Sequence, residues 1–165
     1  MLKTKGITLL LFVMGLISVM AVSLVFYMKE DKPNLSEKII VQADGVTENT
    51  LTVKELTINP GEKRECCVFL ESEIEGDFST IIAFEEIVDS GLKQFINVKI
   101  YLDDQTVYTG TLLELLNGYS VSFLSVLYKD NKTLLKIEYL MPEETGNEAQ
   151  LTTASFYIKI KIEKN

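Results

Sequence analysis

Apolar and polar residues alternate with a period of two in several stretches of this 165-residue chain. The clearest stretch covers residues 96–103. Its apolar set is Ile96, Val98, Ile100 and Leu102, and the intervening set is Asn97, Lys99, Tyr101 and Asp103. Successive side chains of a strand point to opposite faces, so this pattern predicts a strand with one buried face and one solvated face. Such strands have to bury their apolar faces against another layer of structure.

Strand-like segments separated by turn residues fill most of the chain beyond residue 37. They are predicted at 50–58, 64–73, 79–88, 106–110, 119–128, 133–141 and 156–162. The segments 119–128 and 133–141 are predicted to form a hairpin across the turn at 129–132. One segment breaks the pattern, because Leu112, Leu115 and Leu116 have helical spacing and Asn117-Gly118 suits a helix C-cap. About eight strands with one short helix predict an all-β fold, an antiparallel β-sandwich of the jelly-roll type.

The N-terminal segment determines the predicted compartment. Lys3 and Lys5 precede an uncharged run from 6 to 28, which is 23 residues (28 − 5). As a helix this run would extend roughly 34 Å, enough to span a bilayer. Residues 1–28 are therefore predicted to be a signal peptide, cleaved near Ala21 or Ser23, or a retained transmembrane anchor. Residues 29–36 are predicted to be a connector and 37–165 the β-sandwich domain, outside the cell or on its surface.

The charge of the chain argues against one class of partner. The formal net charge is −8. Residues 1–32 carry +2, from four lysines, one glutamate and one aspartate, so the remaining residues carry −10. Such a surface repels a phosphate backbone, and no nucleic-acid partner is predicted.

The residue types present exclude several kinds of catalysis. The chain has no histidine, which removes Ser-His-Asp and Cys-His arrangements and zinc sites that need imidazole. No glycine-rich phosphate loop is present, and no cofactor is predicted. The acidic pairs Glu85-Glu86, Asp103-Asp104 and Glu143-Glu144 remain as candidates for carboxylate chemistry or calcium. Strand neighbours face opposite ways and turns favour acidic residues, so the expectation is a protein that is not an enzyme.

The two cysteines, Cys66 and Cys67, are adjacent. Neighbouring side chains of a strand face opposite ways, so a disulfide between them would need a strained ring. One thiol is predicted to pack in the core while the other faces solvent. The alternative is that the outward thiol forms an intermolecular disulfide, which an oxidising exterior permits.

Three stretches resemble a known family. They are 56–62 (LTINPGE), 110–112 followed by Leu115, and 141–150 (MPEETGNEAQ) leading into 154–156 (ASF). They are similar to the camelysin/TasA-like group, Gram-positive exported proteins of the cell surface and biofilm matrix that are processed by a dedicated signal peptidase. The most distinctive matches are Pro142, Gly146, Asn147, Glu148, Gln150 and Phe156. The adjacent cysteines and the short cleavage region depart from the group.

The resemblance implies a jelly-roll fold and a non-catalytic structural subunit of a surface or biofilm-matrix fibre. One molecule's terminal strand would then complete the next molecule's sheet. Self-association, or association with other surface or matrix proteins, is the implied partnership. Camelysin relatives are classified as metallopeptidases, but a chain without histidine and without a His-Glu-any-any-His motif has nothing to hold a catalytic zinc.

The segment 38–43 is the best candidate for a donor strand, because it is short and carries Ile39, Ile40 and Val41. The alternative is that it packs as an ordinary first strand. A second functional hypothesis is a membrane-anchored binding module for a glycan or protein ligand, which a concave cluster of Tyr101, Tyr108 and Tyr119 would favour. A third is a pilin-like subunit, since 5–11 is similar to a prepilin cleavage region, although Leu11 stands where prepilins carry glutamate.

Overall fold

A computed structural model describes residues 34–42 and 45–165 of the chain, with side chains from residue 38 onward. The predicted signal peptide or anchor, residues 1–28, and the connector up to residue 33 lie outside the described residues. Among the residues that are described, no helix has the length and apolar character needed to cross a membrane.

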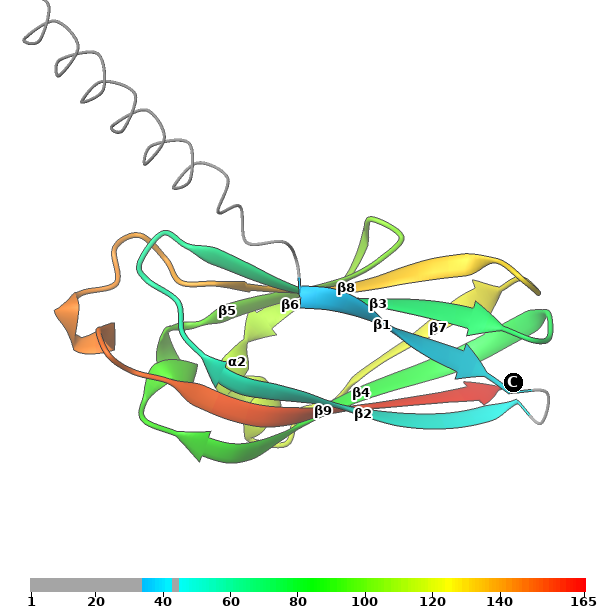
Figure 1. Ribbon diagram of the computed structural model, residues 1–165, viewed down its shortest axis with the longest axis horizontal. Coiled ribbons are helices and arrows are strands. Elements are labelled where there is room, and N and C mark those ends of the chain that lie inside the picture. The colour runs from blue at the N-terminus through cyan, green and yellow to red at the C-terminus, as the bar shows by residue number, and fades with distance from the viewer. Residues whose placement is uncertain (1–33, 43–44) are drawn as a thin grey trace, which may run out of the picture. The chain divides into compact units, whose positions relative to one another are not determined.

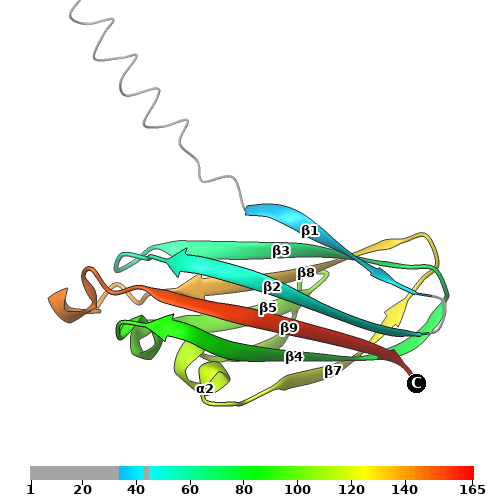
Figure 2. The ribbon, with the colours of Figure 1, turned by 60° about the horizontal axis from the view of Figure 1, so that its bottom comes forward.

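The described residues form nine strands in two sheets (Figures 1 and 2). The strands are β1 (Asn34–Val41), β2 (Val46–Leu56), β3 (Lys63–Ser72), β4 (Gly76–Asp89), β5 (Asn97–Leu102), β6 (Gln105–Thr111), β7 (Val121–Leu127), β8 (Lys132–Leu140) and β9 (Ala154–Lys164). One sheet has the order β1-β3-β8-β5-β6 and the other β2-β9-β4-β7. A short helix α2 (Leu112–Leu116) and two single turns of 3-10 helix, η1 (Leu92–Phe95) and η2 (Asn147–Ala149), complete the fold.

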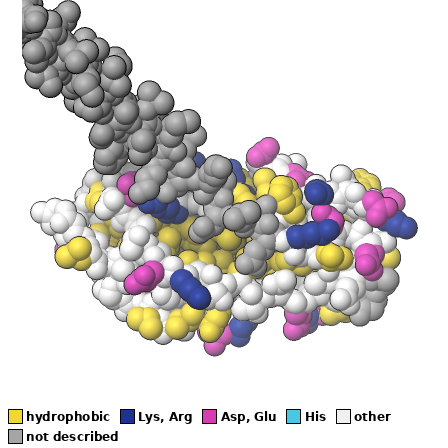
Figure 3. Space-filling view, in the orientation of Figure 1, with side chains coloured by type: hydrophobic (Ala, Val, Ile, Leu, Met, Phe, Trp, Pro, Cys, Tyr) yellow, Lys and Arg dark blue, Asp and Glu magenta, His cyan; other side chains and the backbone are white. Residues whose placement is uncertain are grey.

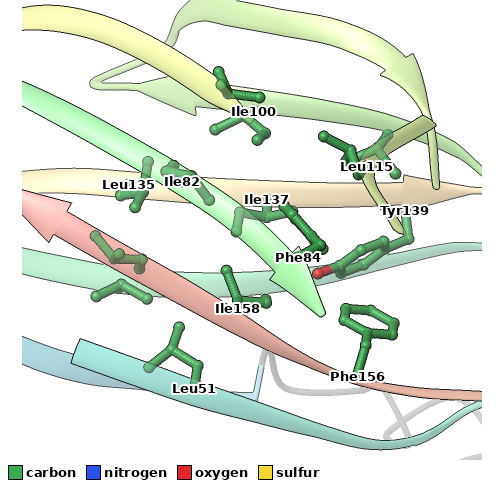
Figure 4. Close-up of a cluster of buried hydrophobic side chains, with 14 of the residues drawn as sticks. Leu51, Ile82, Phe84, Ile100, Leu115, Leu135, Ile137, Tyr139, Phe156 and Ile158 are labelled. Carbon is green, nitrogen blue, oxygen red and sulfur yellow. The ribbon is translucent and has the colours of Figure 1, made fainter. Parts of the chain in front are cut away.

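The alternating patterns place one face of each central strand in a shared core (Figure 4). Strand β8 contributes Leu135, Ile137 and Tyr139 from one sheet, and β9 contributes Phe156 and Ile158 from the other; all five are buried. The prediction of a mostly-β, sandwich-like fold with one short helix is therefore confirmed. Within β5, the buried residues Val98 and Ile100 belong to the predicted apolar face.

Helix α2 begins where the sequence pattern changes, and its first turn is closed by a capping box. The Glu114 backbone N–H donates to Thr111 Oγ1 at 3.2 Å, and the Thr111 backbone N–H donates to Glu114 Oε2 at 2.9 Å. Leu112 and Leu115 are buried, so the helix packs its apolar face against the sheets. The hydrogen bond from the Thr111 backbone N–H also holds the pKa of Glu114 below its ordinary value.

Two strand pairings differ from the predictions. Strands β7 and β8 do not form the predicted hairpin, because β7 pairs with β4 whereas β8 pairs with β3 and β5 in the other sheet. Strand β1 pairs with β3 in parallel, so the predicted antiparallel arrangement is wrong for this pair. The chain leaves β1, forms β2 in the opposite sheet and returns as β3, and this crossover allows parallel pairing. Residues 34–36, predicted as connector, belong to β1.

The hydroxyl of Tyr139 is a destabilising polar group in the core. The side chain is buried, and its hydroxyl oxygen has no hydrogen-bond partner among the described residues. Burial raises the pKa of Tyr139 well above its ordinary value. The change Tyr139→Phe is expected to raise the free energy of unfolding by about 1 kcal/mol, because it removes a buried unsatisfied group and keeps the ring. Urea unfolding followed by tyrosine fluorescence measures this, and a loss of stability would show that the hydroxyl is satisfied in solution.

Candidate functional site

Strand β1, which contains the predicted donor residues, lies at an edge of the five-stranded sheet (Figure 1). Its side chains alternate as in any half-buried strand: Ile39 and Val41 are buried, whereas Ile40 is 46% exposed. The register places Ile39 beside Leu70 of β3. The strand therefore contributes two apolar side chains to the core of its own chain, as the ordinary first-strand alternative expected.

For residues 38–42, polar contacts beyond the β3 ladder hold β1 to Glu71, Glu73 and Thr47. Lys38 Nζ lies 2.5 Å from Glu71 Oε2, and Lys132 Nζ lies 3.3 Å from the other oxygen of the same carboxylate. At the end of the strand, the Glu73 N–H donates to the Val41 carbonyl at 3.0 Å. The Gln42 N–H donates to Thr47 Oγ1 at 3.2 Å. These contacts connect β1 to its neighbours mainly along one edge.

The core-facing side chains of β3 next to β1 are apolar. Val68 and Leu70 of β3 are buried, and they lie in register with Glu37 and Ile39 of β1. If β1 left, the edge of β3 would expose both its unpaired backbone groups and this apolar face. An edge of that kind is a template for an incoming strand. The strand and the edge of β3 thus have the two properties that strand exchange requires.

The Lys38–Glu71 pair predicts how β1 responds to acid. The hydrogen bond from Lys38 is the main cause that lowers the pKa of Glu71 below its ordinary value, and the hydrogen bond from Lys132 adds to it. A carboxylate with a lowered folded-state pKa stabilises the fold above its unfolded-state pKa, and this contribution is lost as pH falls through the folded-state pKa. Hydrogen-exchange protection of β1 is therefore expected to fall relative to that of β9 between about pH 6 and about pH 3. The matched variant Glu71→Gln should show a smaller pH dependence, and equal acid sensitivity in both proteins would contradict the assignment.

The adjacent cysteines lie on β3 and face opposite ways, as predicted. Cys66 packs against the core, whereas Cys67 lies in register with Lys136 on the opposite face of β3. Both cysteines belong to the described residues, and their thiols are not joined to each other. Burial, followed by the nearby charge of Glu65, raises the pKa of Cys67, and Lys136 opposes this shift. The raised pKa favours the less reactive thiol form, so an intermolecular disulfide through Cys67 stays a prediction.

The residues of the family-like motif form the connection between β8 and β9, which belong to opposite sheets. The loop turns at Pro142, whose carbonyl accepts from the Thr145 N–H at 3.1 Å, and continues through η2. At the end of η2, the Gln150 side-chain amide donates to Asn147 Oδ1 at 3.0 Å. Gly146 is the residue before η2 and Glu148 lies within it. The motif therefore shapes the crossover between the sheets.

Phe156, the last motif residue, is buried in the core after this crossover. Its ring centroid lies 5.7 Å from that of Phe84 and 5.9 Å from that of Tyr139. Aromatic pairs at these separations contribute beyond the area that they bury. Phe156 therefore links the end of the motif to both sheets.

The acidic pairs do not converge on a common site. Glu85 forms an ion pair with Lys159, and Glu86 lies 2.5 Å from Lys93 Nζ. Asp103 and Asp104 both have positive φ, 44° and 67°, and form the two-residue turn between β5 and β6. Asp103 Oδ1 also accepts from the Leu134 N–H at 2.7 Å, so its carboxylate has a structural role.

Metal ligands do not gather in the described part of the chain. Glu143 and Glu144 are exposed in the loop after β8. Residues 34–42 and 45–165 contain no group of three or more histidine, cysteine, aspartate or glutamate side chains that could hold a metal ion. Acidic and basic side chains are instead interspersed over the face shown in Figure 3.

The three tyrosines proposed for a binding surface are not brought together. Tyr108 and Tyr119 stack with ring centroids 5.6 Å apart, and the Tyr108 hydroxyl donates to Glu114 Oε2 at 3.3 Å. Burial and then the Glu114 charge raise the pKa of Tyr108 to about 12. Tyr101 instead pairs with Lys136, whose Nζ lies 4.4 Å from the ring centroid. Strands β5 and β6 pair Ile100 with Tyr108 and Tyr101 with Thr106, and a bulge lies between these two pairs. Tyr101 and Tyr108 therefore lie on opposite faces of the sheet.

Comparisons with known protein families and with characterised proteins find no family and no protein that matches this chain. Among the groups described above, β1 with the edge of β3 is the one whose geometry suits an interaction between molecules.

Proposed function

We propose that this chain is an exported, non-catalytic structural subunit of a cell surface or extracellular matrix, with a camelysin/TasA-like jelly roll. It assembles when β1 of one molecule pairs with β3 of the next. The observation that carries this proposal is the position of β1: an edge strand at the start of the described domain that buries two apolar side chains and pairs with one neighbour. Export, and processing by a signal peptidase, rest on the predicted N-terminal segment.

Strand exchange replaces each contact by an identical one. A β1 strand from a neighbour would place its own Ile39 beside Leu70, its own Val41 beside Ser72, and its own Lys38 beside Glu71. The intramolecular and intermolecular states therefore contain the same interactions. The balance between them depends on chain entropy and on protein concentration, as in other domain-swapped proteins. A high local concentration at a cell surface favours the intermolecular state.

An engineered disulfide that holds β1 against β3, and that can be reduced, tests this proposal. Ile40 and Glu71 are partners in the register of β1 and β3, and neither side chain is buried. In a background with Cys66→Ala and Cys67→Ser, the pair Ile40→Cys and Glu71→Cys can form a disulfide that holds β1 in its own sheet. The oxidised protein is expected to stay monomeric in the extracellular fraction of its native host. Reduction should restore polymers, measured by non-reducing size analysis and sedimentation.

The matched control places an engineered disulfide in the other sheet, where it does not restrain β1. Thr50 of β2 and Lys159 of β9 are also register partners, in the other sheet. The variant Thr50→Cys with Lys159→Cys should assemble equally well oxidised or reduced. Polymers that form with β1 locked would reject strand exchange. A monomer that retains residues 1–28 on the membrane under all conditions would favour the anchored glycan or protein binding module, or a pilin-like subunit.

A further inference from the structure

Leu151, in the loop between β8 and β9, combines full exposure with a strained backbone. Its side chain is 100% exposed, so it buries no apolar area in its own chain. Its backbone has φ 63°, in the left-handed region that bulky side chains rarely adopt. Single exposed apolar side chains are ordinary on protein surfaces, but no packing within the chain compensates the strain here. Strained residues cluster at binding sites, so Leu151 is a candidate contact for another molecule.

The residues on both sides of Leu151 are held in place. Ala149 is buried, and its carbonyl accepts from Thr152 Oγ1 at 2.7 Å. The Thr153 N–H donates to Ser90 Oγ at 2.7 Å, and the Ser90 N–H donates to the Thr153 carbonyl at 2.9 Å. The loop is thereby fastened to the end of β4. A side chain presented from a fixed backbone loses little conformational freedom when it binds.

The loop that carries Leu151 is acidic and lies at one end of the sandwich (Figure 1). Residues 141–155 contain Glu143, Glu144 and Glu148 but no lysine or arginine. All three glutamates are exposed. An exposed apolar group among these charges is complementary to an apolar pocket with basic side chains at its rim. Burial of the apolar group supplies affinity, and the charges steer and orient the partner.

Two side chains at the end of β4 add exposed apolar area near this loop. Val88 is 62% exposed and Ile87 is 42% exposed. Val88 lies in register with Ser155 of β9, four residues after Leu151. The apolar contact area at this end of the sandwich therefore extends beyond Leu151.

We propose that Leu151 anchors a docking surface for another protein, one with an apolar pocket rimmed by lysine or arginine side chains. The surface consists of Leu151, the three glutamates of the loop and Val88. A second copy is a poor occupant, because each chain carries −8 and would bring like charge. The same charge opposes an anionic lipid surface. The inference goes beyond the proposed function, since this contact recruits a different protein and uses neither β1 nor β3.

A photo-cross-linker beside the anchor tests whether the surface is occupied. In the full chain, produced in its native host, p-benzoylphenylalanine replaces Gln150 and leaves Leu151 and the glutamates unchanged. Irradiation of intact cells and of the extracellular fraction is expected to give one predominant adduct. Mass spectrometry should assign its partner peptide to another protein and find lysine or arginine in it. The same probe at Thr50, which is exposed on β2, should not give this adduct.

Leu151→Gly, made in the chain with the probe, separates binding from stability. Glycine adopts a positive φ without strain, so the midpoint of urea unfolding should stay equal or rise. The adduct yield should nevertheless fall at least about tenfold, as for the loss of an anchor residue. The matched control is Leu124→Thr, which removes another apolar side chain, 75% exposed on β7. This control should leave the yield unchanged.

Neutralising the loop tests the contribution of charge. Changing Glu143, Glu144 and Glu148 to glutamine is expected to lower the adduct yield about threefold or more. It should also remove most of the dependence of the yield on salt between about 0.05 and about 0.5 M. The matched control changes the net charge equally at the turn between β3 and β4, through Glu73→Gln, Glu75→Gln and Asp77→Asn. This control should keep both the yield and its salt dependence.

Four results would overturn the inference: no adduct at Gln150, an adduct with a second copy or with lipid, an unchanged yield in Leu151→Gly, or equal losses in the two charge variants. The proposed function is tested separately. Leu151→Gly should polymerise like the parent, and the protein with β1 held by the engineered disulfide should form the adduct like the parent. If the parent forms the adduct but no polymers that depend on β1, only the proposed function fails. If it forms such polymers but no adduct, only this inference fails.

Discussion

Phe156→Ala is expected to lower the free energy of unfolding by about 3–5 kcal/mol, the usual range for deleting a large aromatic side chain from a core. Phe156 is fully buried on β9, which lies between β2 and β4. Its ring packs against Phe84 and Tyr139, so the deletion leaves a cavity that borders both sheets. Chemical unfolding monitored by circular dichroism gives the change directly.

The neighbouring residue supplies the control for this substitution. Tyr157 is on the same strand but faces outward and is 37% exposed. Tyr157→Ala should cost about 1 kcal/mol or less, because a surface substitution removes little buried area. Similar losses for the two variants would show that β9 does not turn Phe156 inward and Tyr157 outward.

Gly110→Ala is expected to lower the free energy of unfolding by about 1–3 kcal/mol, the cost of overpacking a closed site. A Cβ at this position would overlap the hydroxyl group of Tyr108, and it would lie 2.7 Å from Glu114 Oε2. Tyr108 stacks on Tyr119 and Glu114 closes the capping box of α2, so neither side chain can move without losing a contact. Thermal unfolding measures the loss, and near-ultraviolet circular dichroism reports the tyrosine stack.

Another glycine tests whether the effect depends on crowding. Gly146 has φ −72°, which any residue adopts, and a Cβ there would meet its nearest atom, Glu148 Oε1, at 3.4 Å. Gly146→Ala is therefore expected to change stability by less than about 0.5 kcal/mol. A large effect at Gly146 with none at Gly110 would contradict the packing around Tyr108.

Local patterns predicted the individual elements well. The alternation at 96–103 corresponds to β5, with Val98 and Ile100 buried, and the segment 133–141 corresponds to β8, with Ile137 and Tyr139 buried. The leucine spacing at 112–116 corresponds to α2. These predictions succeed because the side-chain periods of two and 3.6 belong to the backbone itself.

Pairing between elements was predicted less well. The hairpin expected between 119–128 and 133–141 is absent, since the turn between these segments carries the chain from one sheet to the other. Tyr101 was grouped with Tyr108 and Tyr119, but the bulge after Ile100 separates their registers. A single extra residue in one strand reverses the faces of the residues beyond it, and the alternation within one strand does not reveal it.

For the candidate site, too, the local pattern was predicted and the strand pairing was not. The sequence identified Ile39, Ile40 and Val41 as an apolar segment beyond the connector, but it left open whether they pack within their own chain. It also paired the segment of β7 with that of β8, and it therefore did not predict that β7 pairs with β4 and lies at an edge. Both depend on which strand occupies each edge of the sheets.

The sequence by itself determined that this chain forms amphipathic strands, which residues face the core, and where one short helix interrupts them. Only the tertiary structure decided that β1 runs parallel to β3, that β8 lies between β3 and β5, and that β7 is left at an edge. The physical reason is the distance along the chain between the residues that interact. Alternation is a property of neighbouring residues, whereas strand order is selected by contacts between residues far apart in the chain, after two apolar faces have met.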